Sequence, residues 1–327
     1  MSESFHADHR DRSLGLAVFG SVQILAGLAC LALVPLTLFG MALSPSIEAG
    51  IVAPTLVLYV MAAAALIVLG VGSIRARRWA QALSLSLAWV WLITGVLTLV
   101  VLWLAAPSLW RDLAVSAGLD GGVATAMIIG INLILWTIYV VLPGVMVLFF
   151  RSPHVVATCR RRDTRPNWAS HCPQRLLSLA VTFVFLALSI TAVPSYGFIF
   201  PFFGVLLSGL PGAMLWAAVF VVCLAIARGT IRREPWAWWT AVAGSVTAAV
   251  SSAATFARVD PRTVFEAMSL PPEQLLIMEQ LWPREPWIHV VSWLAIWGSL
   301  LAYLLVVRPL FGEESDNAPN VHHLGRG

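Results

Sequence analysis

Long stretches without a charged side chain constrain this chain more than any other feature. A run of about 20 apolar residues crosses the hydrocarbon layer of a bilayer as a helix, and the helix satisfies its own backbone hydrogen bonds where water is absent. Eight such runs contain no Asp, Glu, Arg or Lys: Leu14–Leu38, Ile51–Val71, Ala80–Leu104, Val123–Phe149, Leu176–Val193, Pro211–Ile226, Trp236–Phe256 and Trp287–Val307. The sequence therefore predicts an all-α integral membrane protein with eight transmembrane helices.

Composition agrees with this class. Hydrophobic residues make up 59% of the chain and charged residues 11%, against about 45–50% and about 25% in soluble domains. The least secure boundary is the one between the fifth and sixth runs, which share one uncharged stretch from Leu176 to Ala227. Pro194, Pro201 and Pro211 interrupt this stretch, and proline breaks helices, so we expect the chain to turn there.

The arginines predict the orientation. The chain contains no lysine, and its 20 basic residues are all arginine. With a cytoplasmic N-terminus, only Arg111, Arg258, Arg262 and Arg284 fall outside the cell, and the other arginines fall in the tails or cytoplasmic segments. Such an excess is the positive-inside signal. We therefore predict a bacterial inner-membrane protein with both termini in the cytoplasm, and we interpret the basic balance as topology and not as nucleic-acid binding.

A short phrase occurs twice at an ungapped offset of 157 residues. It reads "GSIRARRWA" from Gly72 and "GTIRREPWA" from Gly229. In each copy we expect the glycine to end one helix, the arginine (Arg75 or Arg232) to hold the turn in the cytoplasm, and the tryptophan (Trp79 or Trp236) to begin the next helix at headgroup depth. The phrase predicts a four-helix unit written twice.

An even number of crossings gives the two units the same orientation, so they would be tandem parallel repeats. We predict five segments, which are a tail (1–13), a first four-helix repeat (14–151), a basic cytoplasmic linker (152–175), a second four-helix repeat (176–308) and a C-terminal tail (309–327). The loops after the third helix of each unit should form short helices outside the membrane. In the second loop Asp260 would cap one helix, and Pro272 would begin another.

The basic linker contains the strongest candidate contacts for lipid. Arg160, Arg161, Arg162 and Arg165 would attract anionic headgroups on the cytoplasmic side, at about 1 kcal/mol per arginine near the surface, or would act as a plain orientation signal. The linker also holds residues of zinc-ligand type, which are His154, Cys159, His171 and Cys172. Their spacing is not that of a paired ligand motif, and the local charge opposes a cation.

Within the spans, small and polar residues predict helix packing. Gly244, Ala248 and Ser252 recur every four residues, which favours an internal packing seam over an oligomer interface. Gln23 and Asn132 should each form a hydrogen bond to a neighbouring helix. Five tryptophans lie deep in the spans, where they fill lipid-facing positions or line an aromatic cavity: Trp89, Trp91, Trp136, Trp293 and Trp297.

No cluster of catalytic residues emerges. A proton relay or a voltage sensor requires ionisable residues inside the membrane, and the predicted spans contain no Asp, Glu, Arg or Lys. An intramembrane serine protease is disfavoured, because Leu206 occupies the first glycine position before Ser208 and the expected glycine is absent after His289. No histidine pair suits haem. We therefore expect a non-enzymatic protein without a cofactor or metal, serving as a scaffold, accessory subunit or partner-binding element beside membrane lipids and another membrane protein. The alternative is a permease or binding protein for a neutral apolar or amphiphilic molecule held between the repeats.

Overall fold

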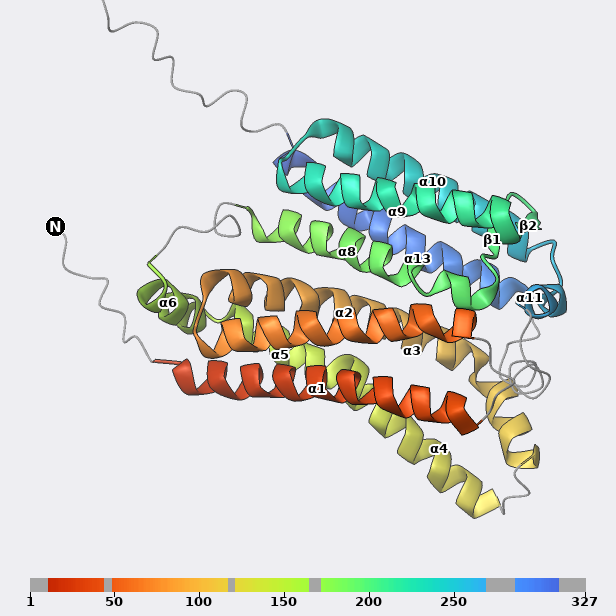
Figure 1. Cartoon of the computed structure of the whole chain (residues 1–327), viewed down its shortest axis with the longest axis horizontal. Helices are drawn as coiled ribbons and strands as arrows, with labels where there is room; N and C mark the ends of the chain where they lie inside the picture. The colour runs from red at the N-terminus through yellow and green to blue at the C-terminus, as the bar shows by residue number, and fades with distance from the viewer. Residues whose placement is uncertain (1–10, 44–48, 117–120, 165–171, 269–285, 312–327) are drawn as a thin grey trace, which may run out of the picture.

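The computed structural model describes residues 11–43, 49–116, 121–164, 172–268 and 286–311, and the helices lie in two groups that run side by side (Figure 1). The first group consists of α1 (Ser13–Leu43), α2 (Ala49–Ile74), α3 (Arg78–Ser116), α4 (Gly121–Trp136), the π-helical turn η1 (Thr137–Val141), α5 (Leu142–Arg151) and the surface helix α6 (Pro153–Arg162). The expected fourth span is thus α4, η1 and α5 in continuous succession.

The second group begins with α8 (Gln174–Ile190). It continues through η2 (Val193–Tyr196), β1 (Phe200–Phe202), β2 (Val205–Leu207), α9 (Gly209–Ile231), α10 (Pro235–Phe256), α11 (Pro261–Ala267), α13 (Pro286–Val307) and η3 (Arg308–Leu310). Each of the eight predicted runs is therefore occupied largely by helix.

Six helical stretches in the described residues are long and apolar enough to cross a membrane. They are Ser13–Leu43, Val52–Ile74, Arg78–Trp103, Thr125–Arg151, Gly209–Ile231 and Trp287–Leu310. These stretches support the expectation of an all-α membrane protein. Of the two remaining predicted spans, α8 is apolar but has only 17 residues, and α10 has 22 residues but is richer in Ser and Thr.

The chain turns between α8 and α9, as the prolines predicted, but it does so through a β-hairpin that the sequence did not predict. Strands β1 and β2 pair antiparallel, with Pro201 opposite Leu206. The chain reverses at Phe203 and Gly204, which both have positive φ angles. Two hydroxyls of α10 hold this hairpin, because Ser251 Oγ donates to the carbonyl of Pro201 at 2.8 Å and Thr255 Oγ1 accepts from the Gly204 amide at 3.0 Å.

The segments beyond α3 and α10 differ from each other. Helix α3 continues without interruption to Ser116, so the short separate helix expected after the third span is instead an extension of that span. Its 39 residues measure about 58 Å at 1.5 Å per residue, more than the membrane requires. After α10, Asp260 caps α11 as predicted, since its carboxylate accepts from the Arg262 amide at 2.9 Å. The helix expected from Pro272 lies outside the described residues.

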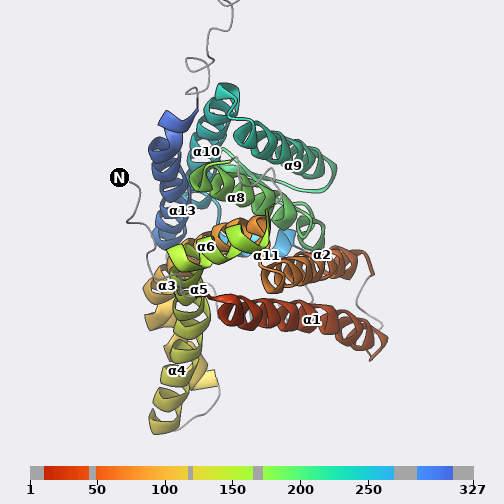
Figure 2. The same ribbon diagram turned by 90° about the vertical axis from the view of Figure 1, so that its left-hand side faces the viewer.

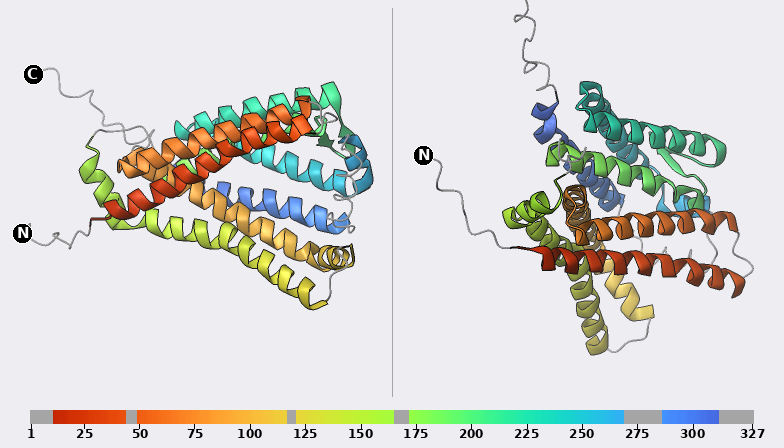
Figure 3. Two further views of the ribbon diagram at one scale, coloured as in Figure 1. Left: turned by 60° about the horizontal axis from the view of Figure 1, so that its bottom comes forward. Right: turned by 60° about the vertical axis from the view of Figure 1, so that its left-hand side comes forward.

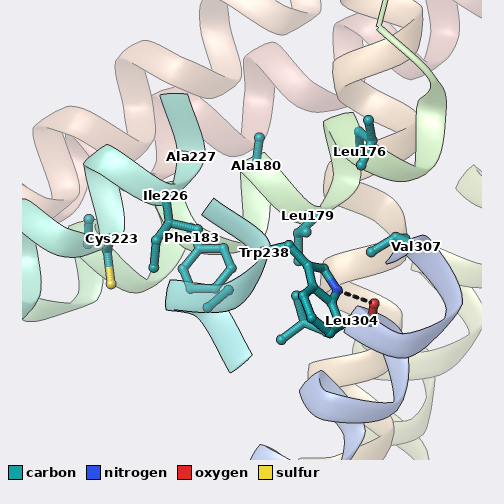
Figure 4. Packing of buried hydrophobic residues seen from close by; sticks show 12 residues of the cluster. Leu176, Leu179, Ala180, Phe183, Cys223, Ile226, Ala227, Trp238, Leu304 and Val307 are labelled. Carbon is teal, nitrogen blue, oxygen red and sulfur yellow. Dashed lines mark hydrogen bonds between the residues drawn. The ribbon is translucent and has the colours of Figure 1, made fainter. Parts of the chain in front are cut away.

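Each group has its own buried cluster. In the second group Leu179, Phe183 and Ile226 pack around Trp238, whose indole N–H donates to the Leu304 carbonyl at 2.7 Å (Figure 4). Trp238 is 6% exposed and therefore belongs to the core of this group. In the first group Phe150, Leu16 and Met146 belong to a second cluster. The two clusters share no residue.

Polar contacts inside the first group test two predictions. Gln23 of α1 donates to Ser84 Oγ of α3 at 3.0 Å and accepts from Ser73 Oγ of α2 at 3.1 Å, so the predicted interhelical bond is confirmed. The prediction for Asn132 was wrong, because its amide donates to the carbonyl of Ile128, one turn earlier in the same helix. Gln23 differs from Asn132 because a serine on each of two neighbouring helices lies within hydrogen-bond distance of it.

The segments that the arginine distribution assigned to the cytoplasmic side lie mostly at one end of the bundle. The beginning of α1, the α2–α3 and α9–α10 turns, helix α6 and the end of α13 all lie at this end (Figures 1 and 3). Viewed along the bundle, α3 and α13 lie next to each other where the two groups meet, and α4 projects away from the rest (Figure 2). We call this end the basic end.

Candidate functional site

The two copies of the repeated phrase form turns of the same geometry. In the first, Arg77 N bonds to the Gly72 carbonyl at 2.9 Å, and Ala76 has a φ of 50°. In the second, Glu234 N bonds to the Gly229 carbonyl at 2.9 Å, and Arg233 has a φ of 58°. Trp79 and Trp236 each occupy the second position of the helix that follows. The turns thus match residue for residue at the offset of 157.

The role assigned to the glycines was wrong. Gly72 and Gly229 lie within α2 and α9 and do not end them. Instead they permit close packing, because a Cβ on Gly72 would lie 2.6 Å from the Cβ of Ala80, and one on Gly229 would lie 2.7 Å from that of Ala237. The rings of the following tryptophans lie against the same positions. Arg75 and Arg232 are exposed, and Arg232 lies 3.8 Å from Glu234.

The predicted small-residue seam is displaced. Gly244 is exposed and a Cβ there would meet no atom within 4 Å, Ala248 is half-buried, and Ser252 is buried. The buried row of α10 is instead Ala241, Ser245, Ala249 and Ser252. Gly244 therefore packs against no neighbour in the described part of the chain. The closest helix approach that involves glycine on both sides joins α1 to α2, where a Cβ on Gly20 would lie 2.6 Å from the carbonyl oxygen of Gly70.

Three of the four arginines predicted to contact lipid lie on α6. Arg160, Arg161 and Arg162 are exposed in its last turn, and Val155 and Cys159 on its other face are buried. Arg165 lies outside the described residues.

The buried carboxylate of Asp163 fastens α6 to the bundle. It accepts from Arg77 Nη1 at 3.2 Å and from the backbone amide of Arg78 at 3.1 Å. Asp163 thereby caps the N-terminus of α3 from another element, where a negative charge is favoured by the helix dipole.

A cavity of about 1290 Å³ lies between the two helix groups, next to α6. This exceeds the roughly 300–1,000 Å³ of ordinary small-molecule sites. It was not identified from the sequence as a site. Its lining comes from α3, α5, α6, α8 and α13 and includes Arg78, Gln81, Leu85, Trp89, Ile93, Thr94, Leu97, Arg151, Arg160, Gln174, Arg175, Ser178, Thr182, Phe185, Trp293, Ile296, Trp297, Leu300 and Tyr303.

Chemical character changes along this cavity. Near the basic end the lining contains Arg78, Arg151, Arg160 and Arg175. Further along α3 and α13 it becomes aromatic and aliphatic. Between Arg78 and Leu97 the α3 wall covers about 28 Å at 1.5 Å per residue. The cavity is therefore an elongated, amphipathic space.

The deep tryptophans divide between the two interpretations left open by the sequence. Trp89, Trp293 and Trp297 line the cavity, whereas Trp136 is 49% exposed on the outside of the bundle. Trp293 also stacks on Phe256, with ring centroids 5.8 Å apart and planes 14° apart. Trp136 therefore fills a lipid-facing position, and Trp89, Trp293 and Trp297 form part of an aromatic cavity wall. The fifth, Trp91, does neither and packs against the buried cluster of the first group.

Two buried donors that line the cavity have no hydrogen-bond partner in the described part of the chain. They are Arg78 Nε and the indole nitrogen of Trp297. A buried donor without a partner costs about 1–3 kcal/mol, so the cavity favours a molecule that brings acceptor atoms. Arg78 Nη2 is occupied, since it donates to the Arg160 carbonyl at 3.0 Å.

A polar contact joins the two helix groups beside the cavity. The Gln174 amide donates to Ser86 Oγ at 2.8 Å and to the Ala82 carbonyl at 3.0 Å, and Ser178 Oγ lies 3.2 Å from Ser86 Oγ. Tyr303 of α13 donates to the Arg175 carbonyl at 2.8 Å. These bonds hold α3, α8 and α13 at the basic end while leaving the aromatic part of the cavity open.

Among the residues that the structure describes, His154, Cys159 and Cys172 belong to no candidate metal site, and His171 lies outside the described residues. All four cysteines are free, and no group of three or more His, Cys, Asp or Glu within the described residues could hold a metal ion. Burial, followed by the nearby Asp163 carboxylate, raises the pKa of the Cys159 thiol to about 11. Cys159 is therefore a neutral thiol in the cavity wall at physiological pH.

Comparison of the chain with protein-family models, with curated proteins and with solved structures found no match. The class of protein defined by the fold is a multi-pass helical membrane protein. The cavity and the basic end are the features of the molecule that bear on its function.

Proposed function

We propose that this protein is a non-enzymatic membrane protein that binds an amphiphilic molecule in the cavity between its two helix groups. The cavity carries this proposal, because it combines an elongated aromatic wall with two unpartnered buried donors. A scaffold needs no such space, since a tightly packed centre would be more stable. The cavity therefore favours the permease or binding protein over the scaffold.

The proposal includes eight crossings in two tandem repeats. Helix α8 has 17 residues, which measure about 26 Å at 1.5 Å per residue, and η2 begins after two intervening residues, so this segment approaches the hydrocarbon core of about 30 Å. Helix α10 is long enough, and the Ser and Thr residues that make it less apolar are mostly buried against protein, among them Ser245, Ser251 and Thr255. The two matching turns support the repeat.

The orientation follows from the same end of the bundle. Helix α6, both arginine turns and the last described helix end lie there, and cytoplasmic ends are rich in arginine. We therefore place the basic end in the cytoplasm of a bacterium and the β1–β2 hairpin outside the cell. Exposed arginines of α6 that do not line the cavity, Arg161 and Arg162, would meet anionic lipid headgroups.

A photoactivatable probe tests the binding site. We would use hexadecanol carrying a diazirine on its chain, added to the full chain in nanodiscs, and map the labelled peptides by mass spectrometry. Lipid-facing helices should be labelled in proportion to probe concentration. Cavity residues of α3, α8 and α13 should be labelled in a saturable manner, because the site is a single one.

A pair of threonine variants provides the control. Thr182 lines the cavity and Thr98 of α3 is exposed, and each hydroxyl donates to the carbonyl four residues earlier. The Thr182→Trp variant should remove the saturable labelling, and Thr98→Trp should retain it. Labelling that never saturates in the wild-type protein would refute binding in the cavity.

A further inference from the structure

We infer that the cavity binds an amphiphile whose headgroup is a phosphate-type anion, with the headgroup at Arg78, Arg151, Arg160 and Arg175 and the chain along Trp89 and Trp297. This inference rests on the proposed function and specifies its ligand. The sequence had suggested a neutral cargo, because no charged residue lies inside the predicted spans. The cavity changes that expectation, because it extends to the ends of several spans, where arginines line it.

Four arginines from four elements line one end of the cavity, which we call its mouth. Arg78 begins α3, Arg151 ends α5, Arg160 lies in α6 and Arg175 lies in the first turn of α8. Positive-inside topology requires arginines at this end of the bundle, but it does not require them to line one space. Their convergence is the feature that points to a ligand.

The acidic groups described nearby are committed elsewhere. In the described part of the chain the ion pairs of the basic end join Arg77 to Asp163, Arg162 to Asp11 and Arg232 to Glu234, and none uses the four arginines of the mouth. Arg78 Nε is also an unpartnered donor. Arginine presents a planar set of donors that matches phosphate oxygens well, so a tetrahedral anion suits this mouth.

The rest of the cavity fits a hydrocarbon chain. Beyond the mouth its lining includes Leu85, Trp89, Ile93, Phe185 and Trp297. The α3 wall of about 28 Å is longer than one leaflet, which is about half of the 30 Å hydrocarbon layer. A small soluble anion would leave this apolar surface facing water. A headgroup with one long chain covers both parts of the cavity.

Two probes that differ only in the headgroup test the inference. Diazirine-bearing hexadecyl phosphate would be compared with the diazirine-bearing hexadecanol used above, on the full chain in nanodiscs of neutral lipid. We expect the phosphate probe to saturate the cavity at a concentration at least about tenfold lower, because hydrogen bonds to a charged group contribute that much to affinity.

Matched arginine variants locate the headgroup. Arg160→Gln and Arg175→Gln should each reduce severalfold the phosphate advantage, which is the ratio of the concentrations at which hexadecanol and hexadecyl phosphate saturate the cavity. Arg75→Gln and Arg228→Gln are the controls, because both arginines are exposed at the same end and neither lines the cavity. An equal loss in all four variants would mean that the phosphate probe responds only to surface charge, and would overturn the inference.

The remaining outcomes separate the two proposals. If both probes saturate the cavity at the same concentration, the inference of an anionic headgroup is overturned, and the proposed amphiphile site is retained. An absence of saturable labelling by either probe would refute the amphiphile site itself. Inorganic phosphate is added as a competitor. If it removes the advantage of the phosphate probe as effectively as unlabelled hexadecyl phosphate does, the ligand is a free anion and the lipid headgroup is ruled out.

Discussion

At the scale of single residues, the structure explains why glycine occupies the repeated turns. Gly72 and Gly229 each face an alanine and a tryptophan of the next helix at a separation that leaves no space for a methyl group. The left-handed residue of each turn is not glycine, because Ala76 and Arg233 occupy that position. The sequence repeat therefore records a packing requirement between two antiparallel helices, and the requirement is the same in both groups.

This requirement predicts the effect of alanine at three glycines. Gly72→Ala and Gly229→Ala should each lower the free energy of unfolding by about 1–3 kcal/mol, as expected for overpacking. Gly244→Ala is the control, because its Cβ would meet nothing, and alanine is the better helix former. Thermal unfolding in detergent, followed by circular dichroism, measures the difference. The packing explanation fails if all three variants melt together.

At the scale of elements, α6 depends on one buried carboxylate. Asp163 binds both the Arg77 side chain and the first amide of α3, and it is 3% exposed. The α6 arginine that lines the cavity, Arg160, lies three residues earlier. The position of the mouth of the cavity thus depends on the contact of Asp163, in the linker, with Arg77 and Arg78 of the first repeated turn. The sequence indicated a basic linker but not its attachment.

Neutralising Asp163 should loosen α6 and change its thiol. In Asp163→Asn we expect faster amide exchange over α6, and stability lowered by about 1 kcal/mol, because Arg77 is 42% exposed and stays hydrated. The pKa of Cys159, about 11 with Asp163 charged, should fall, since removing a nearby negative charge favours the thiolate.

Alkylation of a variant that retains only Cys159 measures that pKa, because the thiolate is the nucleophile. Its rate should rise up to about pH 11 in the parent and level off at lower pH in Asp163→Asn. Asp11→Asn is the control, since Asp11 pairs with Arg162 at the surface. An unchanged alkylation profile in Asp163→Asn would disprove the coupling between the carboxylate and the thiol.

Sequence reasoning succeeded for elements and failed for their mutual contacts. Apolar runs located the helices, because the bilayer fixes both the length and the composition of a span. They did not reveal the β1–β2 hairpin, whose backbone groups are held by Ser251 and Thr255 far along the chain. The apolar runs also did not show which polar residue of a span would bond to a neighbouring helix. Gln23 and Asn132 are both single amides in apolar runs, and only the packing of the helices shows that Gln23 forms such a bond and Asn132 does not.

At the scale of the whole molecule, the cavity exists because the two groups have separate cores. Each group buries its own apolar cluster, and α3, α8 and α13 meet at the basic end through Gln174 and Tyr303. The individual residues of the mouth were visible in the sequence as topology signals. Their convergence depends on how the two groups lie against each other, which no local pattern contains.

The number of crossings is the property of the whole molecule on which the rest depends. With eight crossings the α2–α3 and α9–α10 turns lie on the same side of the membrane. If only the six stretches that are both long and apolar enough crossed, α8 would remain on the starting side and α9 would carry Arg232 to the opposite side from Arg75. The position of these two arginines therefore distinguishes the two topologies.

Single cysteines in a cysteine-free background show on which side of the membrane each turn lies. Arg75→Cys and Arg232→Cys, both at exposed positions, should react with a membrane-impermeant maleimide in inside-out vesicles and not in right-side-out vesicles. Arg258→Cys, at the exposed end of α10, should show the reverse pattern. Because the mouth of the cavity and the repeat both require the two turns to share a face, labelling of Arg75→Cys and Arg232→Cys from opposite sides would remove the basis for the tandem repeat and for a cytoplasmic entrance to the cavity.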